Sequence, residues 1–434
     1  MSAATHVRTW FGLQPETNLR QCVQSKEHAV FLVGAAVIVV HLLTQAFVDP
    51  EPMSSASDNI VTGLTGPALV ALAAAVYPRL AIGFRSAAAI VLGVFAAITG
   101  LAIHGIHAVA AGTSVSDVTG IAAAACGLVL LGMGVWLAWK ALPHLALKLA
   151  LVPLVPWLIL QLVLPLAFAT YIVNTPRQGL GDQSPADYSL AYEDVRFETE
   201  DGVTLAAWYT PSENGAAVIL VHGAGKNRTK TLDHAALLAS HGYGTLMVDM
   251  RGYGESEGSP VALGWTGEKD TSAALRYLQS RDDVDPGRIG ALGLSMGGEI
   301  VLWTAGENEG IAAVVAEGNE MRSWREIEQE DGPAIKYVAL VNVRNMYTAI
   351  ELMSGVDQPP SNKDMIAEIA PRPVLLISTG SGGERTWGRT LHEAGGPTTE
   401  LWETGGGHID SLYEHPEEYE QRVVGLFDEA LLGE

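Results

Sequence analysis

The chain has 434 residues, of which 48% are hydrophobic and 17% are charged, against about 25% charged residues in an ordinary soluble protein. Residues 1–175 have a net charge of +1, whereas the rest of the chain has a net charge of −23. This acidic rear half argues against nucleic-acid binding, because phosphate contacts require clustered lysine and arginine. The uneven charge predicts a membrane-embedded front half and a water-exposed rear half.

The front half consists largely of long apolar runs. The first run, 29–48, contains no acidic or basic residue apart from His41. It is long enough to cross a hydrocarbon core, which takes about 20 helical residues. Lipid offers the backbone no hydrogen-bond partners, so each run is expected to be a helix. Five spanning helices are predicted, at 29–48, 59–77, 86–110, 118–139 and 149–173, which together form a transmembrane domain at 29–175.

The lysines and arginines of residues 1–175, which lie between or before the five runs, are all predicted to be on one side of the membrane. Three of them precede the first span, and the loops before the third and fifth spans hold two each. The other loops contain acidic residues only. The positive-inside rule then places residues 1–28 in the cytoplasm and, after an odd number of spans, the rear half on the extracytoplasmic side of the cell membrane.

Few other features of the front half suggest chemistry. Four histidines lie in or beside the spans, at His41, His104, His107 and His144. Neutral histidines hydrogen-bonded within the bundle are the preferred interpretation, although ionisable groups in membranes are often functional. Both cysteines, Cys22 and Cys126, lie in this half and form no metal-binding spacing.

After a proline- and glycine-containing linker at 176–187, the rear half, 188–434, alternates predicted strands with predicted helices. This alternation predicts a mainly parallel sheet covered by helices on both faces, with ligands bound beyond the carboxyl ends of the strands. The expected strands are 194–198, 203–209, 216–221, 244–249, 288–294, 311–316, 373–378 and 399–403. The expected helices are 229–241, 266–280, one that begins at Met296, and 415–431.

The segment Gly293-Leu294-Ser295-Met296-Gly297 matches the pattern G-x-S-x-G between a predicted strand and a predicted helix. In so sharp a turn, side chains at the two outer glycines would clash with neighbouring backbone. The turn is expected to lift the Ser295 hydroxyl clear of the sheet as a nucleophile. The alternative is a glycine-rich turn with a solvent-facing serine.

Two further loops, together with this turn, resemble those of the α/β-hydrolase family. His222-Gly223-Ala224-Gly225 follows the third strand, and the segment 249–256, DMRGYGES, follows the fourth. The resemblance implies an oxyanion hole formed by the backbone N–H groups of Ala224 and Met296, each worth about 3–4 kcal/mol. His222 and Arg251 are interpreted as residues that shape these loops.

The resemblance also implies that the base follows the nucleophile and the acid along the chain. Gly405-Gly406-Gly407-His408 follows the last strand and resembles the family's histidine turn, so His408 is the expected general base. His392 and His415 are alternatives by residue type only.

The acid departs from the family pattern. The loop after strand 373–378 contains no aspartate, and Glu384 is its only carboxylate. Glu384 is therefore the expected acid, which would fix the histidine tautomer. A surface glutamate favoured by a helix dipole is the alternative for this residue. Glu317, after the preceding strand, is the second candidate acid.

These residues predict a membrane-anchored serine hydrolase that cleaves a carboxylic ester through an acyl-enzyme. Residues 318–370 are expected to form a helical cap that sets specificity. A serine peptidase or acyltransferase of the same fold, or a non-catalytic ligand-sensing domain, are the alternatives. The sequence has no metal or P-loop signature, so no cofactor is expected. The expected partners are a small-molecule or lipid acyl substrate and membrane lipids; the sequence does not indicate an oligomeric state.

Overall fold

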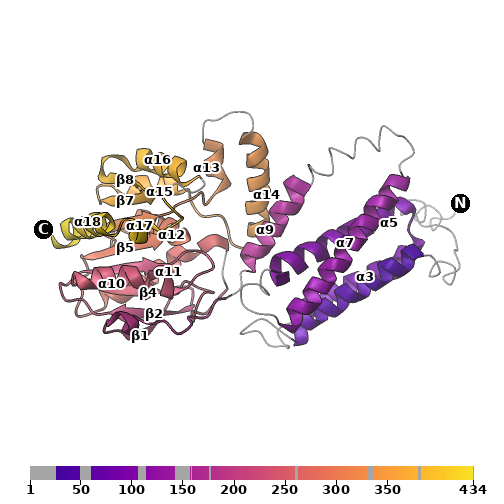
Figure 1. The fold of residues 1–434 in the computed structure, drawn as a ribbon, viewed down its shortest axis with the longest axis horizontal. Helices are drawn as coiled ribbons and strands as arrows, with labels where there is room; N and C mark the ends of the chain where they lie inside the picture. Colours follow the sequence, from indigo (N-terminus) through magenta and orange to yellow (C-terminus); the bar gives the residue numbers. More distant parts are fainter. Residues whose placement is uncertain are drawn as a thin grey trace. The chain divides into compact units, whose positions relative to one another are not determined.

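A computed structural model describes residues 26–48, 60–105, 114–141, 157, 159–174, 177–259, 262–329, 336–379 and 383–433. The chain divides into two compact units, Met1–Asn174 and Thr175–Glu434 (Figure 1).

The described residues of the first unit are helical apart from short connections, as the apolar runs predict. Three helical segments are long and apolar enough to cross a membrane: Lys26–Val48, Ile82–Leu101 and Val115–Ala141. The predicted spans at 59–77 and 149–173 correspond to shorter helices, and residues 142–156 lie outside the described ones. Membrane insertion and the side of the N-terminus stay predictions. The helices are α3 (Lys26–Leu43), α4 (Ile60–Val76), α5 (Ile82–Ile98), α7 (Val115–Ala141) and α9 (Leu164–Val173).

Two histidines are hydrogen-bonded inside this helical unit. A ring nitrogen of His104 lies 3.1 Å from the Asp117 carboxylate, and one of His41 lies 3.2 Å from the Thr119 hydroxyl. Both rings are thus hydrogen-bonded within the unit, and their neutral state stays a prediction. His107 and His144 lie outside the described residues.

Helices α5 and α7 approach each other closely because glycines face glycines. A Cβ added to Gly93 would lie 2.6 Å from the carbonyl oxygen of Gly127, and one added to Gly127 would lie 2.8 Å from that of Gly93. Small residues of this kind let helix backbones pack tightly in bundles. Gly132, on the same helix α7, has no neighbour within 4 Å of its Cβ position.

We expect Gly127→Val to destabilise the first unit by about 1–3 kcal/mol, because the added methyl groups must push α5 and α7 apart. Gly132→Val is the matched control and should leave the stability close to that of the wild type. Thermal unfolding of the detergent-solubilised chain, followed by circular dichroism, measures both. Equal melting temperatures for the two variants would contradict the tight packing.

The second unit contains an eight-stranded sheet with strand order β1-β2-β4-β3-β5-β6-β7-β8. Strand β2 pairs antiparallel with β1 and β4, and all other neighbours are parallel. The prediction of a mainly parallel sheet is confirmed. The strands are β1 (Glu193–Glu198), β2 (Thr204–Thr210), β3 (Ala217–Val221), β4 (Gly244–Val248), β5 (Ile289–Leu294), β6 (Ala313–Glu317), β7 (Val374–Ser378) and β8 (Thr399–Glu403).

Helices cover both faces of the sheet. Alternate side chains of the strands enter two separate apolar clusters, one on each face. Helices α10 (Leu232–Ser240) and α18 (Pro416–Phe427) cover one face. The other face is covered by α11 (Gly267–Gln279), α12 (Met296–Glu307), α15 (Asn362–Ile369) and α16 (Glu384–Gly395).

Between β6 and α15, the chain forms α13 (Trp324–Gln329) and α14 (Lys336–Ser354). These two helices occupy the predicted cap region, whereas α15 packs against α12 and α16 over the sheet. The parallel strands bring the loops after β3, β4, β5, β6, β7 and β8 to one edge, called the carboxyl edge below. The predicted site residues all lie in or beside these loops.

Candidate active site

The Ser295 turn joins β5 to α12 in a conformation that few residues adopt. Ser295 has φ 54° and ψ −121°, and it is half-buried. A Cβ on Gly293 would collide with the backbone of Gly297, and one on Gly297 would collide with the carbonyl oxygen of Val221. The Ser295 N–H donates to the Glu317 carbonyl oxygen at 2.7 Å, which ties the turn to the end of β6.

Glu384 and His408 are joined by a short hydrogen bond. The Nδ1 atom of His408 lies 2.5 Å from Oε1 of Glu384, whose side chain is fully buried. The other carboxylate oxygen accepts from the Thr379 hydroxyl at 2.6 Å and from the Thr379 N–H at 3.1 Å. The carboxylate therefore orients the imidazole: Nδ1 donates to Glu384, and Nε2 lies on the side of the ring away from the carboxylate.

This pair shifts both pKa values. Burial opposes ionisation of Glu384, but the hydrogen bonds from His408 and Thr379 outweigh it, and the carboxyl pKa is lowered. The hydrogen bond to Glu384 raises the pKa of His408, and this effect outweighs the lowering caused by burial of the ring. The carboxylate thus stabilises the protonated imidazole.

Ser295 and His408 both lie beside the residues that end β6. The Ser295 N–H binds the carbonyl oxygen of Glu317, and a Cβ on Gly318 would lie 3.0 Å from Cε1 of His408. Within the described residues, no hydrogen bond joins the Ser295 hydroxyl to the His408 ring. Such contacts are often long in ligand-free enzymes and tighten when substrate binds.

The second candidate acid, Glu317, has a different partner. Its Oε1 atom accepts from the Ser411 N–H at 3.0 Å, three residues beyond His408, and burial raises the carboxyl pKa. No hydrogen bond connects it to His408 among the described residues. Glu317 therefore supports the loop that carries His408, and the geometry favours Glu384 as the partner of the imidazole.

The loop after β3 is held by His222. The buried ring lies with Nδ1 2.8 Å from the Gly223 carbonyl oxygen, and its Nε2 accepts from the Met250 N–H at 3.2 Å. Burial lowers the pKa of this histidine. Neutral His222 therefore donates from Nδ1 to Gly223. Because a peptide group is planar, fixing this carbonyl also fixes the direction of the Ala224 N–H.

The two expected oxyanion donors are available. Neither the Ala224 N–H nor the Met296 N–H donates to another residue in the described part of the chain. Met296 is the first residue of α12, where N–H groups have no partner within the helix. A Cβ on Gly223 would lie only 3.3 Å from Cβ of Ser295, so this loop runs beside the nucleophile turn.

Comparison with known proteins agrees with this architecture. Residues 216–392 match a family described as alpha/beta hydrolase fold. The esterase Pf2001 of Pyrococcus furiosus is 26% identical, with a TM-score of 0.50 over 60% of this chain and 98% of its own. The second unit has the α/β-hydrolase fold.

Two relatives cover different shares of the chain. The uncharacterized protein YfhR of Escherichia coli strain K12 is 27% identical over 291 residues, covering 63% of this chain and 95% of YfhR. The alpha/beta hydrolase domain-containing protein WAV2 of Arabidopsis thaliana is 29% identical over 201 residues, covering 45% of this chain and 63% of WAV2.

The alternative histidines of the hydrolase unit have other surroundings. His392 and His415 line a surface hollow along α18, together with Pro373, Val374 and Thr399 at the starts of β7 and β8. The His415 ring also lies against Trp402 in β8. Among the described residues, no hydrogen bond joins either histidine to Ser295 or Glu384.

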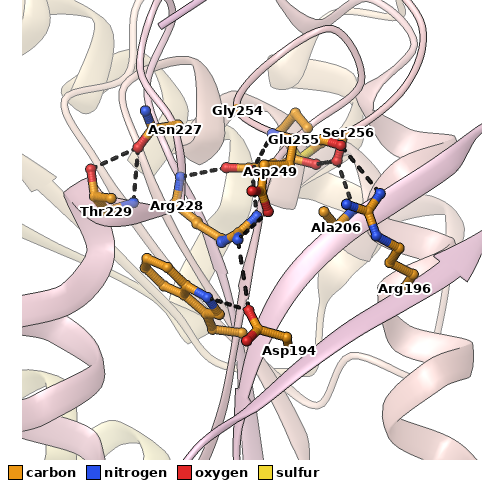
Figure 2. A network of polar contacts seen from close by, with 12 residues as sticks. Asp194, Arg196, Ala206, Asn227, Arg228, Thr229, Asp249, Gly254, Glu255 and Ser256 are labelled. Carbon is orange, nitrogen blue, oxygen red and sulfur yellow. Dashed lines mark hydrogen bonds and ion pairs between the residues drawn. The ribbon is translucent and has the colours of Figure 1, made fainter. Parts of the chain in front are cut away.

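A buried ion pair joins two loops at the carboxyl edge of the hydrolase unit (Figure 2). The guanidinium of Arg228 lies 2.6 Å from Oδ2 of Asp249, and the Arg228 N–H donates to Oδ1 at 2.8 Å. Asp249 also accepts from the Glu255 N–H at 2.8 Å, and the Arg228 guanidinium stacks on Trp208 at 4.3 Å. The pair holds the Ala224 loop against the loop after β4. Sequence inspection missed Arg228, since 21 residues separate it from its partner.

We expect Arg228→Met to lower the free energy of unfolding of the hydrolase unit by about 3–5 kcal/mol, because Asp249 would remain buried and unpaired. Arg196→Met is the control, since Arg196 is exposed and forms one long contact, at 3.4 Å, with the Glu255 carbonyl oxygen. Its effect should stay within about 0.5 kcal/mol. Urea titration followed by tryptophan fluorescence measures both, and equal losses would contradict the role of the pair.

Proposed function

We propose that this chain is a membrane-anchored serine esterase whose nucleophile, base and acid are Ser295, His408 and Glu384. The observation that carries the proposal is the bond between His408 and the buried Glu384 carboxylate, at the same edge as a serine held at positive φ. A domain that only binds a ligand requires neither feature. The similarity to an esterase from Pyrococcus furiosus favours ester hydrolysis over peptide cleavage.

The mechanism begins with acylation of Ser295. As Oγ bonds to the ester carbonyl carbon, Nε2 of His408 accepts the hydroxyl proton, and the carbonyl π electrons move to oxygen. The Ala224 and Met296 N–H groups stabilise that oxyanion. When the intermediate collapses, the C–O bond to the alcohol breaks, and the imidazolium gives its proton to the leaving oxygen. Glu384 stabilises the imidazolium throughout.

Deacylation repeats these steps with water. His408 accepts a proton from a water molecule as its oxygen bonds to the acyl carbon of the acyl-enzyme. Collapse of the second intermediate breaks the bond to Oγ, and His408 returns the proton to Ser295. The products are a carboxylic acid and an alcohol, and the enzyme regains its starting protonation.

The apolar helices of the first unit support an anchoring role. Three of them have the length and composition of membrane spans. If all five predicted spans cross the membrane, the basic residues lie on one side and the hydrolase domain would act at the extracytoplasmic face of the cell membrane. An anchored enzyme of this kind meets substrates that reside in or near the bilayer.

We expect a fluorophosphonate probe to label the wild-type chain in membranes and to leave Ser295→Ala unlabelled, because the probe reacts with an activated serine. Ser280→Ala is the control: this hydroxyl is exposed, bonds the Tyr277 carbonyl oxygen and should not affect labelling. Labelling that persists in Ser295→Ala would refute the nucleophile.

We expect hydrolysis of p-nitrophenyl acetate to fall as the pH drops through the pKa of His408, which must be neutral to act as a base. Because Glu384 raises this pKa, the acid limb should lie above the ordinary histidine value of about 6.5. Glu384→Gln should lower kcat by about 10⁴-fold and move the residual acid limb to lower pH.

Glu317→Gln is the matched control for this profile, since an amide oxygen can still accept from Ser411. It should keep most of the turnover and an acid limb near that of the wild type. If Glu317→Gln lost activity and Glu384→Gln kept it, the acid would be Glu317.

A further inference from the structure

The exposed apolar side chains of the hydrolase domain gather in the cap. Five large apolar side chains are exposed in its described residues, and four of them are Met321, Val341, Leu352 and Met353, which lie in or beside α13 and α14. Leu352 is 80% exposed. Clustered exposed apolar residues mark a contact surface, whereas single ones need no explanation.

Cationic and aromatic side chains lie in the same region. Trp324 is flanked by two exposed arginines: the guanidinium of Arg344 lies 4.9 Å from its ring and that of Arg325 lies 5.9 Å from it. Neither arginine forms an ion pair with a described residue. This arrangement is notable in a half of the chain with a net charge of −23. Tryptophan with arginine is typical of surfaces at the boundary of a bilayer.

The cap is firmly joined to the body beside the candidate active site. Arg322 donates to the Glu299 carbonyl oxygen at 2.9 Å, one helical turn after Ser295. The Tyr347 hydroxyl donates to the Met321 carbonyl oxygen at 2.9 Å, and its ring stacks on Trp265. The surface therefore has a fixed position at the carboxyl edge.

A buried carboxylate further fixes α13. Both oxygens of Glu326 accept two hydrogen bonds each, from the N–H groups of Arg322 and Ser323 and from the hydroxyl of Ser361 and the N–H of Asn362. These donors connect the first turn of α13 to the start of α15, which packs over the sheet. Trp324 and Arg325 are thus presented on a rigid support.

The chain also enters the hydrolase domain at the carboxyl edge. Arg177 donates to the carbonyl oxygens of Gly254 at 3.3 Å, Ser256 at 2.6 Å and Gly258 at 3.1 Å, all in the loop after β4. The apolar helix α9 ends at Val173, four residues earlier in the sequence. The first described residues of the hydrolase domain are therefore fixed at the edge that carries the site.

We propose that a cap surface made of Met321, Trp324, Arg325, Val341, Arg344 and Leu352 binds the anionic phospholipid surface of the bilayer. The arginines would bind lipid phosphates, and the apolar side chains would enter the headgroup boundary. Residues 318–370 hold nine acidic and five basic residues, so the attraction to anionic lipid would come from these two arginines and not from the charge of the whole cap. Resting on the proposed function, this assigns the substrate class: acyl esters held in the bilayer.

The test uses the full chain in lipid nanodiscs, which expose both faces of the bilayer, made from phosphatidylcholine with or without phosphatidylglycerol. One substrate is bilayer-resident 4-methylumbelliferyl oleate and the other is water-soluble p-nitrophenyl acetate. Arg325→Glu/Arg344→Glu should lower turnover of the oleate in phosphatidylglycerol nanodiscs by about tenfold or more, since each arginine near an anionic surface contributes about 1 kcal/mol. Turnover of the acetate should be unchanged.

The matched control is Arg276→Glu/Arg288→Glu, which makes the same charge change at two exposed arginines outside the cap. It should keep the activity on both substrates. Wild-type and cap-variant proteins with equal turnover of the oleate would overturn the proposal, as would a similar loss in the control. A wild-type protein that cleaves neither ester contradicts the proposed function instead.

A second measurement does not depend on activity. Leu352→Cys should react with a membrane-impermeant maleimide in phosphatidylcholine nanodiscs and be protected in phosphatidylglycerol nanodiscs, with the unsubstituted chain as background for Cys22 and Cys126. Equal reactivity in both lipids would overturn docking on anionic lipid. Equal protection in detergent and in every nanodisc indicates a second copy of the chain over the cap and also overturns it.

Discussion

The candidate site depends on one conformational constraint: a serine at positive φ must fit between a strand and a helix. A residue in such a conformation costs about 1–3 kcal/mol, so the surrounding structure has to hold it. Glycines at 293 and 297 remove the collisions that any side chain would cause, and the Ser295 N–H is fixed to the end of β6. The loop after β3 then runs beside Ser295 at Gly223, and His408 lies beside Gly318 at the end of β6.

Most of the architecture could be read from the sequence, because unbroken apolar runs and turn residues specify buried strands locally. The strand whose start differs most from the prediction is instructive. The run 311–316 predicts a strand from Ile311, yet β6 begins at Ala313, although Ile311 is fully buried. A buried residue just before a strand is as apolar as one within it, so composition alone does not mark where the strand begins. The partnership of Arg228 and Asp249 was unreadable, because it depends on β3 and β4 being neighbours in the sheet.

The acid illustrates a different limit of sequence reasoning. Two interpretations of Glu384 competed: a triad member, or a helix-terminal glutamate favoured by the dipole. In the structure Glu384 is the first residue of α16 and is also bonded to His408. The positive end of the helix and the imidazole act on the same carboxylate. Glu317, the second candidate by position, accepts a hydrogen bond from Ser411, whereas Glu384 is bonded to His408.

The place of Glu384 at the start of α16 has a consequence for the contact with His408. Buried Trp387, Gly388 and Leu391 pack α16 against the sheet, which sets where the backbone of Glu384 lies. An aspartate at this position would be shorter by one methylene, so from the same backbone its oxygens would lie farther from the imidazole than those of Glu384. The reach of the side chain, as well as its charge, therefore determines the contact with His408.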